Sequence, residues 1–581
     1  MPERSGMTQS NVLKVVVHVK EDRYHSNSQS NHCDCRRPHT IPSPALDLRP
    51  RLVVIGLHRR QFHTRRGNDS RTQQDYAHCR GRRLSMWITF GMIAAFFIFV
   101  IIVMERSTAK DASFSDYATG GRSFNSVYGT AAFINTWLPG TVFISFAGLT
   151  AGSGVTGFYL VQYSVFAAII MFLLAKPAYL WGTRYDLRTQ ADLLGLRYGS
   201  TTVRVIAAII GVIASIPWVV LGMQSLALIF SFSSDGAIGP VFAVVLGVVV
   251  LTIRQIWTVK FGMRGVMISD LIQGIAAYLI GFVVIFGLIV WLIANNHGFD
   301  QVDPALLVLP GPGSELGPLY LFSLVLTGAL GGWCWPDIFV RLFTQNGVST
   351  IRRTSVQAVP ILLVFATALN VLALLASSVP EVAAAPDTVW FVLASFGGPL
   401  LLGLAGICVL CGSMGNVGAN LQAIGAMTAN DIIGPMKKQE IQNARIGKIS
   451  VAAVTIISSL GALATASTTS GLVLWAQVSY QGICQLAPTL FLGIFWRRTT
   501  ALSAILGMIL GFGTAAIVQI FYPISVPWLG GMTSGIAGLI INTAVMVAVS
   551  LLMPNSAKEQ TRVDNLFAEL NQKQKDEKQA S

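Results

Sequence analysis

One broken apolar stretch decides the fold: Asn135-Thr136-Trp137-Leu138-Pro139-Gly140-Thr141, inside the apolar run 126–149. Pro139 removes a backbone donor and clashes with the preceding helical turn, and Gly140 adds backbone freedom. A second break, from Gly328 to Pro336, interrupts the run 318–335. Non-helical backbone at membrane depth persists only where it is buried in protein or lines a cavity. The two breaks therefore predict helices that line a site inside a membrane protein.

The composition supports lipid as the solvent. The chain has 581 residues, of which 53% are hydrophobic and 12% are charged, whereas a soluble protein carries about 25% charged residues. Each of its apolar runs has about 20 residues or more, enough to cross a hydrocarbon core of roughly 30 Å. We count thirteen runs: 87–104, 126–149, 156–181, 203–231, 238–253, 266–293, 318–335, 356–379, 389–429, 445–466, 471–496, 500–522 and 530–553. We expect the long run 389–429 to include a short separate helix before Gly397.

The basic residues give an independent check on this count. Every Lys and Arg after residue 85 falls in alternate loops or in the tail, and the opposite loops hold none. Positive charge collects on the cytoplasmic side of membrane proteins. An odd number of spans then places the N-terminus outside and the C-terminus in the cytoplasm. The net charge of +14 lies in two separate populations, the N-terminal residues 1–85 and the loops and tail after them, so we expect no nucleic-acid partner.

Three segments differ in composition. Residues 1–85 are basic and contain no long apolar run, so we expect a disordered N-terminal extension. Residues 86–555 form the predicted transmembrane domain, and residues 556–581 form a short cytoplasmic tail. The predicted topology would place the basic extension outside, against the charge bias. We therefore expect the natural chain to begin at Met86.

The two breaks also fall at matching positions. They interrupt the second and the seventh span, which are five spans apart. Broken helices at corresponding places in two halves are a sequence signature of secondary transporters with inverted repeats. This spacing predicts core repeats over about 126–293 and 318–496 in a five-plus-five arrangement.

Several motifs resemble those of the sodium:solute symporter family, in the same order along residues 86–555. They are Asp116-Tyr117-Ala118-Thr119-Gly120-Gly121-Arg122-Ser123, Gly262-Met263-Arg264-Gly265-Val266 with Asp270-Leu271-Ile272-Gln273, Pro336-Asp337-Ile338 with Arg341, Ala429-Asn430-Asp431-Ile432, and Gly482 to Arg498. The resemblance implies an all-α membrane protein of the LeuT type with about thirteen helices. It also implies uptake of a small solute coupled to Na⁺.

The resemblance implies a cation site between the break of the second span and the ninth span. By alignment its backbone and side-chain positions are Asn135, Leu138, Gly412, Gly415 and Asn416. The family usually has hydroxyl side chains at the last two positions, where this chain has Gly415 and Asn416. Sodium and proton coupling therefore both stay open. We expect no cofactor other than the coupling ion.

Polar and aromatic residues near the breaks are candidates for solute binding. They are Trp137, Thr141, Gln162, Trp333, Gln477, Tyr480 and Gln481, with Tyr163, Trp335 and Gln485 beside them. Gln477, Gln481 and Gln485 form one helical stripe, for which interhelical hydrogen bonding is an equal alternative. Structural or gating roles are expected for Pro139, Pro336, Asp270, Asp337 and Arg341, with Asp337 and Arg341 as a pair.

The sequence thus predicts a secondary transporter in a bacterial inner membrane, surrounded by lipid, with the oligomeric state open. The expected reaction is cation-coupled symport, with Na⁺ first, of a small solute such as a monocarboxylate, an amino acid or a vitamin. The alternatives are a proton-coupled transporter of the same fold and a non-transporting sensor. We expect no enzyme, because the spans hold no nucleophile–base arrangement.

The topology is testable by labelling single cysteines in intact cells. A membrane-impermeant thiol reagent added outside should modify Asp303→Cys and leave Lys437→Cys unmodified until the cells are opened. The two loops lie on opposite sides in the charge-based topology. Labelling of Lys437→Cys but not of Asp303→Cys in intact cells would show that the topology is the reverse of the predicted one.

Overall fold

The computed structural model describes residues 69–579 apart from 107–112, 235, 313 and 467–471. The chain divides into two compact units, Met1–Arg83 and Leu84–Ser581, and the description below concerns the second. α1 (Asp69–Arg106) begins inside the segment that the composition separates at residue 85. The rest of the expected extension, residues 1–68, lies outside the described residues. The described residues are almost entirely helical and contain no named β-strand.

The first half of the bundle runs from α1 to the long, kinked helix α9. Its further helices are α2 (Phe114–Thr119), η1 (Gly120–Arg122), α3 (Ser126–Trp137), η2 (Gly140–Phe143), α4 (Ser145–Ser153), η3 (Gly154–Phe158), α5 (Tyr159–Arg184), α6 (Gln190–Tyr198), α7 (Thr201–Ser225), α8 (Ala227–Ser233) and α9 (Pro240–Ala294).

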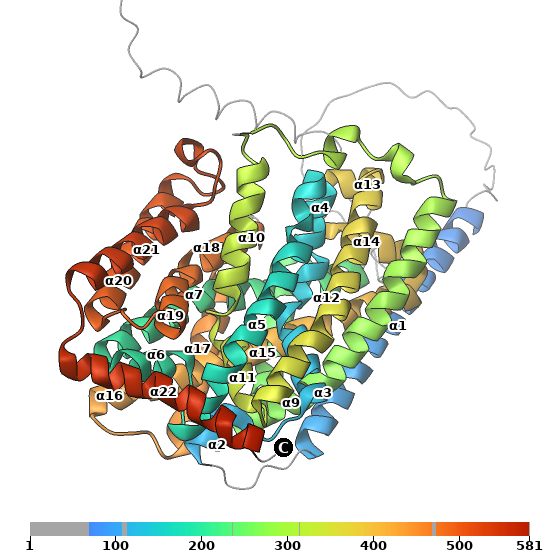
Figure 1. Ribbon diagram of the computed structural model, residues 1–581. Coiled ribbons are helices and arrows are strands. Elements are labelled where there is room, and N and C mark those ends of the chain that lie inside the picture. The colour runs from blue at the N-terminus through green and yellow to red at the C-terminus, as the bar shows by residue number, and fades with distance from the viewer. Residues whose placement is uncertain (1–68, 107–112, 235, 313, 467–471, 580–581) are drawn as a thin grey trace, which may run out of the picture. The chain divides into compact units, whose positions relative to one another are not determined.

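The second half repeats the pattern of a broken helix followed by long spans. Its helices are η4 (Phe299–Gln301), η5 (Pro304–Leu307), α10 (Pro318–Gly332), α11 (Pro336–Thr344), α12 (Val348–Ala376), α13 (Pro380–Ala384), η6 (Pro386–Thr388), α14 (Val389–Phe396), α15 (Gly398–Met427), η7 (Thr428–Ile433), α16 (Gly434–Lys437), α17 (Ala444–Ala464), α18 (Leu472–Ile483), η8 (Cys484–Leu486), α19 (Ala487–Phe495), α20 (Ala501–Phe521), η9 (Pro527–Leu529), α21 (Ser534–Leu552) and α22 (Ala557–Gln579). Figure 1 shows the helices side by side, with α22 across one end.

The number of membrane crossings depends on how long elements are divided. Ten helices in the described residues are long and apolar enough to cross a membrane, or eleven with the bent pair α10–α11. α9 has 55 residues, and a straight helix of that length would span about 80 Å. Gly262 breaks it, with φ 61° and ψ −150°, a conformation open to glycine. α9 thus contains two of the expected runs, and the exact count of thirteen stays a prediction.

Both expected helix breaks are present. α3 ends at Trp137, Leu138 leaves helical geometry, and Pro139 starts the short helix η2. α10 and α11 meet at a bend of 44°. The run 389–429 is also divided, because α14 ends at Phe396 and α15 starts at Gly398. These breaks confirm the sequence-based prediction at the places that matter for the site.

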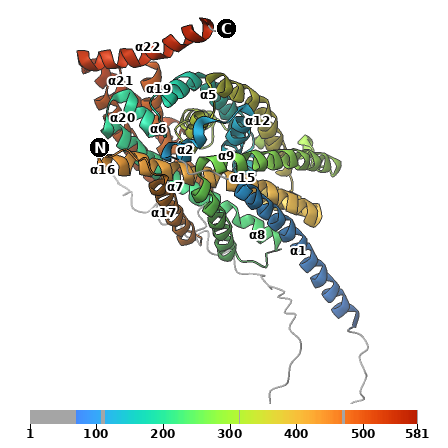
Figure 2. The same ribbon diagram turned by 90° about the horizontal axis from the view of Figure 1, so that it is seen from below.

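α15 forms the centre of the bundle. It is buried almost continuously from Leu402 to Met427 and packs against α3, α7, α9 and α17. Figure 2 shows α9, α12 and α15 together, with α22 at one edge. Glycines on α15 permit close approach: a Cβ at Gly425 would lie 2.5 Å from Val451 Cα on α17. Because glycine has no side chain at these positions, the backbone of a neighbouring helix can contact the backbone of α15.

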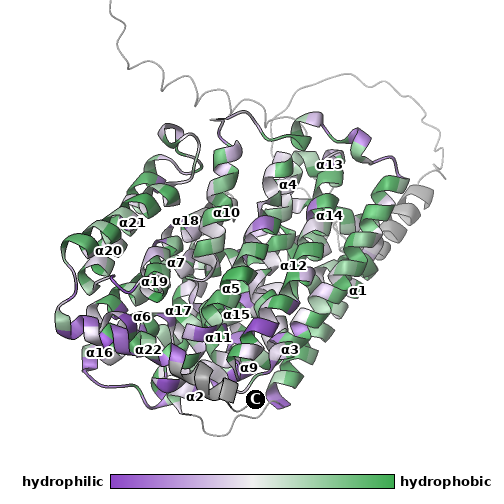
Figure 3. Cartoon of the chain, in the orientation of Figure 1, coloured by the Kyte–Doolittle hydropathy of each residue, from purple (hydrophilic) through white to green (hydrophobic). Residues whose placement is uncertain are grey.

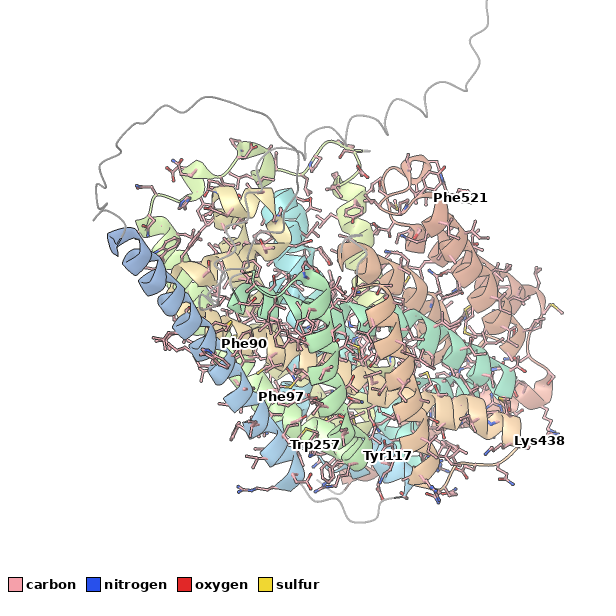
Figure 4. The ribbon with its side chains drawn as sticks, turned by 180° about the vertical axis from the view of Figure 1, so that it is seen from behind. Phe90, Phe97, Tyr117, Trp257, Lys438 and Phe521 are labelled. Carbon is pink, nitrogen blue, oxygen red and sulfur yellow. The ribbon has the colours of Figure 1, made fainter. Side chains whose placement is uncertain are left out.

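The two ends of the bundle differ in polarity. Figure 3 shows apolar helices with polar residues gathered around α6, α16 and α22. Figure 4 places Lys438 at the same end as Tyr117 and Trp257, and Phe521 at the other end. The tail helix α22 packs here, since Arg562 donates to the carbonyls of Leu196 and Arg197 at 2.8 Å each. The expected tail is therefore an ordered helix over most of its length.

The packing of α15 predicts a contrast between two glycine substitutions. Gly425→Ala should lower the free energy of unfolding by about 1–3 kcal/mol, because the new methyl group meets the backbone of α17. Gly287→Ala on α9 meets nothing within 4 Å and should be neutral or slightly stabilising. Thermal unfolding of both purified variants measures the difference. Equal stability of the two variants would contradict the close α15–α17 contact.

Candidate functional site

The two helix breaks face one cavity. Five segments line it, namely α3, α7, the α10–α11 bend, α15 and α18. The lining residues are Thr136, Trp137, Trp218, Gly332, Trp335, Asp337, Ile338, Asn416 and Tyr480. In this conformation the free space holds about one water molecule. A bound solute would therefore require the lining side chains to move apart.

Aromatic rings form one wall of this cavity. The ring centroids of Trp218 and Trp335 are 5.3 Å apart, and Tyr480 lies 5.5 Å from the first and 5.6 Å from the second. These distances are typical of favourable aromatic pairs. Trp137 is held separately, because its Nε1 donates to Ser164 Oγ at 2.8 Å. The rings are thus positioned by α3, α7, α11 and α18 together.

Asp337 presents a carboxylate to the same cavity. It follows Pro336, which occupies the first position of α11 and fixes the start of that helix. Asp337 is 1% exposed, and no side chain donates a hydrogen bond to either of its oxygens; only the backbone N–H groups of Asp337 and Ile338 lie near them. The start of a helix favours negative charge through its free N–H groups and dipole. Even so, the carboxylate oxygens remain available to a ligand.

A buried ion pair lies beside the break of α3. Arg341 Nη2 is 2.7 Å from Asp270 Oδ2 and donates to Thr136 Oγ1 at 2.8 Å. Asn135 Nδ2 donates to Asp270 Oδ1 at 3.1 Å. This arrangement corrects the expected pair of Asp337 with Arg341. Both residues lie on α11, but Arg341 reaches across to α9 and α3 instead.

The expected cation position is occupied by protein donors. Asn416 Nδ2 donates to Thr136 O at 3.1 Å, and Trp218 Nε1 donates to Asn416 Oδ1 at 2.9 Å. Tyr278 Oη donates to Leu138 O at 3.0 Å and to the carbonyl of Ile134 at 2.9 Å. Two of the oxygens expected to coordinate a cation, Leu138 O and Asn416 Oδ1, therefore already accept a hydrogen bond within the protein.

Glycines at the other two expected positions bring α15 against the break. A Cβ at Gly412 would lie 2.5 Å from Gly140 N, and one at Gly415 would overlap Asn135 Nδ2. The amide of Asn135 thus fills the space that a hydroxyl side chain at position 415 would need. Four buried oxygens near this region have no hydrogen-bond partner: Asn135 Oδ1, Thr141 Oγ1, Ser145 Oγ and Ser413 Oγ.

Only some of the residues expected to bind the solute line the cavity. Trp137, Trp335 and Tyr480 line the cavity. Thr141 is buried in η2, and Gln162 is exposed on α5; neither lines it. Trp333 packs against Phe133 and donates to Ala167 O at 2.8 Å.

The glutamine stripe serves helix packing where it is described. Gln481 Oε1 accepts from Gly535 N at 2.9 Å, and Gln485 Nε2 donates to Gly535 O at 3.0 Å. Both therefore face α21, as the interhelical alternative predicts. The side chain of Gln477 lies outside the described residues. Sequence reasoning missed Trp218, although the Pro217–Trp218 pair inside α7 marked an unusual point in that span.

The fold and the site define a class of protein: a secondary transporter with two broken helices around a central cavity. The model of the Sodium:solute symporter family matches residues 117–511. This match covers more than half of the chain, and the chain belongs to that family. The family and the structural relatives are transporters and not enzymes, and the protein is a multi-pass membrane protein.

Curated relatives are similar over most of their length. The uncharacterized symporter YhjB of Bacillus subtilis is 25% identical over 493 residues, covering 80% of this chain and 96% of the relative. A monocarboxylic acid transporter of Corynebacterium glutamicum is 24% identical, with 74% and 83% covered. The high-affinity proline transporter PutP of Bacillus subtilis is 22% identical, with 70% and 87% covered.

A solved structure shares the fold. It is the substrate-bound, outward-open state of a Na⁺-coupled sialic acid symporter, with a TM-score of 0.64 and 16% sequence identity. The alignment covers 81% of this chain and 98% of that structure. At this identity the likeness establishes the LeuT-type architecture.

The ion pair predicts a strong effect on stability. Asp270→Asn should lower the free energy of unfolding by about 3–5 kcal/mol, because it leaves the Arg341 charge buried without its partner. The double variant Asp270→Asn/Arg341→Met should recover much of that loss, since no unpaired charge remains. Thermal unfolding of the purified proteins measures both. A double variant no more stable than Asp270→Asn would show that the pair is not the cause.

Proposed function

We propose that the protein carries a small organic solute across the membrane by symport with a cation. The observation that carries this proposal is the cavity shared by the breaks of α3 and α10–α11. A cavity between two broken helices allows alternating access when one repeat moves against the other. Family membership supports symport in particular.

Sodium is the first candidate for the coupling ion. The family name and the Na⁺-coupled structural relative support it. A cation at the break of α3 would use the carbonyls near Asn135 and Leu138 and the side-chain oxygen of Asn416. Its binding would require Trp218 and Tyr278 to give up their present hydrogen bonds to Asn416 and Leu138.

A specific observation favours protons as the second candidate. Asn416 uses both ends of its amide within the protein, and the usual hydroxyl at position 415 is absent. Amide and hydroxyl donors thus take the role that a bound Na⁺ would have toward these carbonyls. These hydrogen bonds would have to be given up or shared on Na⁺ binding, whereas a proton requires no coordination cage.

The first solute classes to test follow from the names of the relatives. Monocarboxylates and proline are named for two relatives, so organic acids, amino acids and vitamins form the first uptake panel. We place the protein in the bacterial inner membrane, with the N-terminus outside and the C-terminus in the cytoplasm. The charge distribution supports that orientation.

The coupling ion is tested by uptake into vesicles containing the full chain. Initial rates are measured against Na⁺ at fixed pH, and then against pH without Na⁺. With Na⁺ as the coupling ion, Asn416→Ala should raise the half-saturating Na⁺ concentration by about tenfold, since it removes one polar contact to a charge. Gly287→Ala is the control variant and should leave that concentration unchanged.

The other outcomes are distinct. Uptake that ignores Na⁺ but collapses when the proton gradient is dissipated would reject sodium and support protons. Uptake that ignores both gradients would reject symport. Restoring hydroxyls with Gly415→Ser/Asn416→Thr should increase Na⁺ dependence only if Asn135 leaves the space that the serine needs.

A further inference from the structure

Three acidic side chains are buried in the described part of the chain, and one of them differs from the other two. Asp270 pairs with Arg341, and Asp431 pairs with Arg204. Asp337 has no side-chain partner for either oxygen, and only the backbone N–H groups of Asp337 and Ile338 at the start of α11 lie near its carboxylate. A buried carboxylate without a partner is costly. Such a carboxylate is neutralised either by a proton or by a cation that enters the cavity.

The nearest cationic residue on the same helix is already engaged. Arg341 lies one turn after Asp337 on α11, but its Nη2 contacts Asp270 and Thr136, and its Nη1 contacts Met267 Sδ at 3.0 Å. The N-terminus of α11 stabilises negative charge at Asp337 only in part. The carboxylate instead lines the cavity between the broken helices.

The rest of the cavity suits a positive charge. The faces of tryptophan and tyrosine rings attract cations, and they do so more strongly where water is excluded. Trp218, Trp335 and Tyr480 contact one another, and all three line the cavity with Asp337. The cavity lining includes no Lys, Arg or His. A carboxylate solute would meet a like charge there, whereas a cationic nitrogen would meet a carboxylate and aromatic rings.

We propose that this cavity binds the positively charged nitrogen of an organic ammonium solute, between the Asp337 carboxylate and the rings of Trp218, Trp335 and Tyr480. This assignment rests on the proposed transport function and names the solute class for the same site. The narrow space favours a compact head group, because the rings already lie within contact distance of one another. Aromatic side chains around a cationic nitrogen are a known mode of ammonium recognition.

The test compares compounds of equal shape and different charge. Choline and its neutral isostere 3,3-dimethylbutan-1-ol, and tetramethylammonium, butylammonium, proline and pyruvate, are titrated into the purified full-length protein by calorimetry at constant pH. An ammonium compound should bind at least about tenfold more tightly than its neutral isostere, as expected for a desolvated cation on rings and a carboxylate. Pyruvate should bind most weakly.

Two variants test whether the preference for the ammonium compound depends on the Asp337 carboxylate. Asp337→Asn keeps the shape of the side chain and should reduce the preference for the ammonium compound at least about threefold, because the attraction of the carboxylate is lost while that of the rings remains. Asp300→Asn removes an exposed carboxylate from a loop and should change neither affinity. If Asp337→Asn does not fold, the comparison of choline with its neutral isostere on the unaltered protein still tests whether the cavity prefers a positive charge.

The outcomes separate this proposal from the proposed transport. Binding of no ammonium compound, or equal binding of both isosteres, would overturn the ammonium assignment. Coupled uptake of pyruvate or of a neutral solute would then leave symport intact. If choline binds as expected but neither choline nor any solute in the vesicle panel is transported, the site assignment holds and the transport proposal fails.

Discussion

The structure depends on one constraint: backbone polar groups at membrane depth must find partners inside the protein. The break after Trp137 exposes carbonyls that a continuous helix would have satisfied. Tyr278 on α9 donates to Ile134 O and Leu138 O, and Asn416 on α15 donates to Thr136 O. Because these donors come from two other helices, the break can exist only where α3, α9 and α15 meet.

The same helices set the distribution of buried charge. Asp270 and Arg341 neutralise each other next to the break, so they tie α9 to α11 and orient Asn135. Asp337 lies on the cavity side of α11 and has no such partner. One helix thus carries two ionisable groups with different roles: Arg341 connects helices, and Asp337 faces the space between them.

Much of the architecture could be predicted from sequence, because it follows from patterns along the chain. Pro139 and Pro336 with their neighbouring glycines located both breaks, and the division before α15 followed from Gly397 and Gly398. The partners of polar groups could not be predicted in this way. Asp337 and Arg341 are one turn apart, but the ion pair forms across helices. Gln481 and Gln485 share a stripe, but which neighbour they face depends on the position of α21.

The central claim is that one cavity between the broken helices opens in turn to each side of the membrane. Its most direct measurement uses Ile338→Cys, which lines the cavity, in a chain whose seven native cysteines are replaced. Labelling with an impermeant thiol reagent is followed in right-side-out and in inside-out vesicles, with and without transported solute. The account predicts labelling from both sides and protection by the solute. Labelling from one side only, or labelling that the solute does not change, would contradict it.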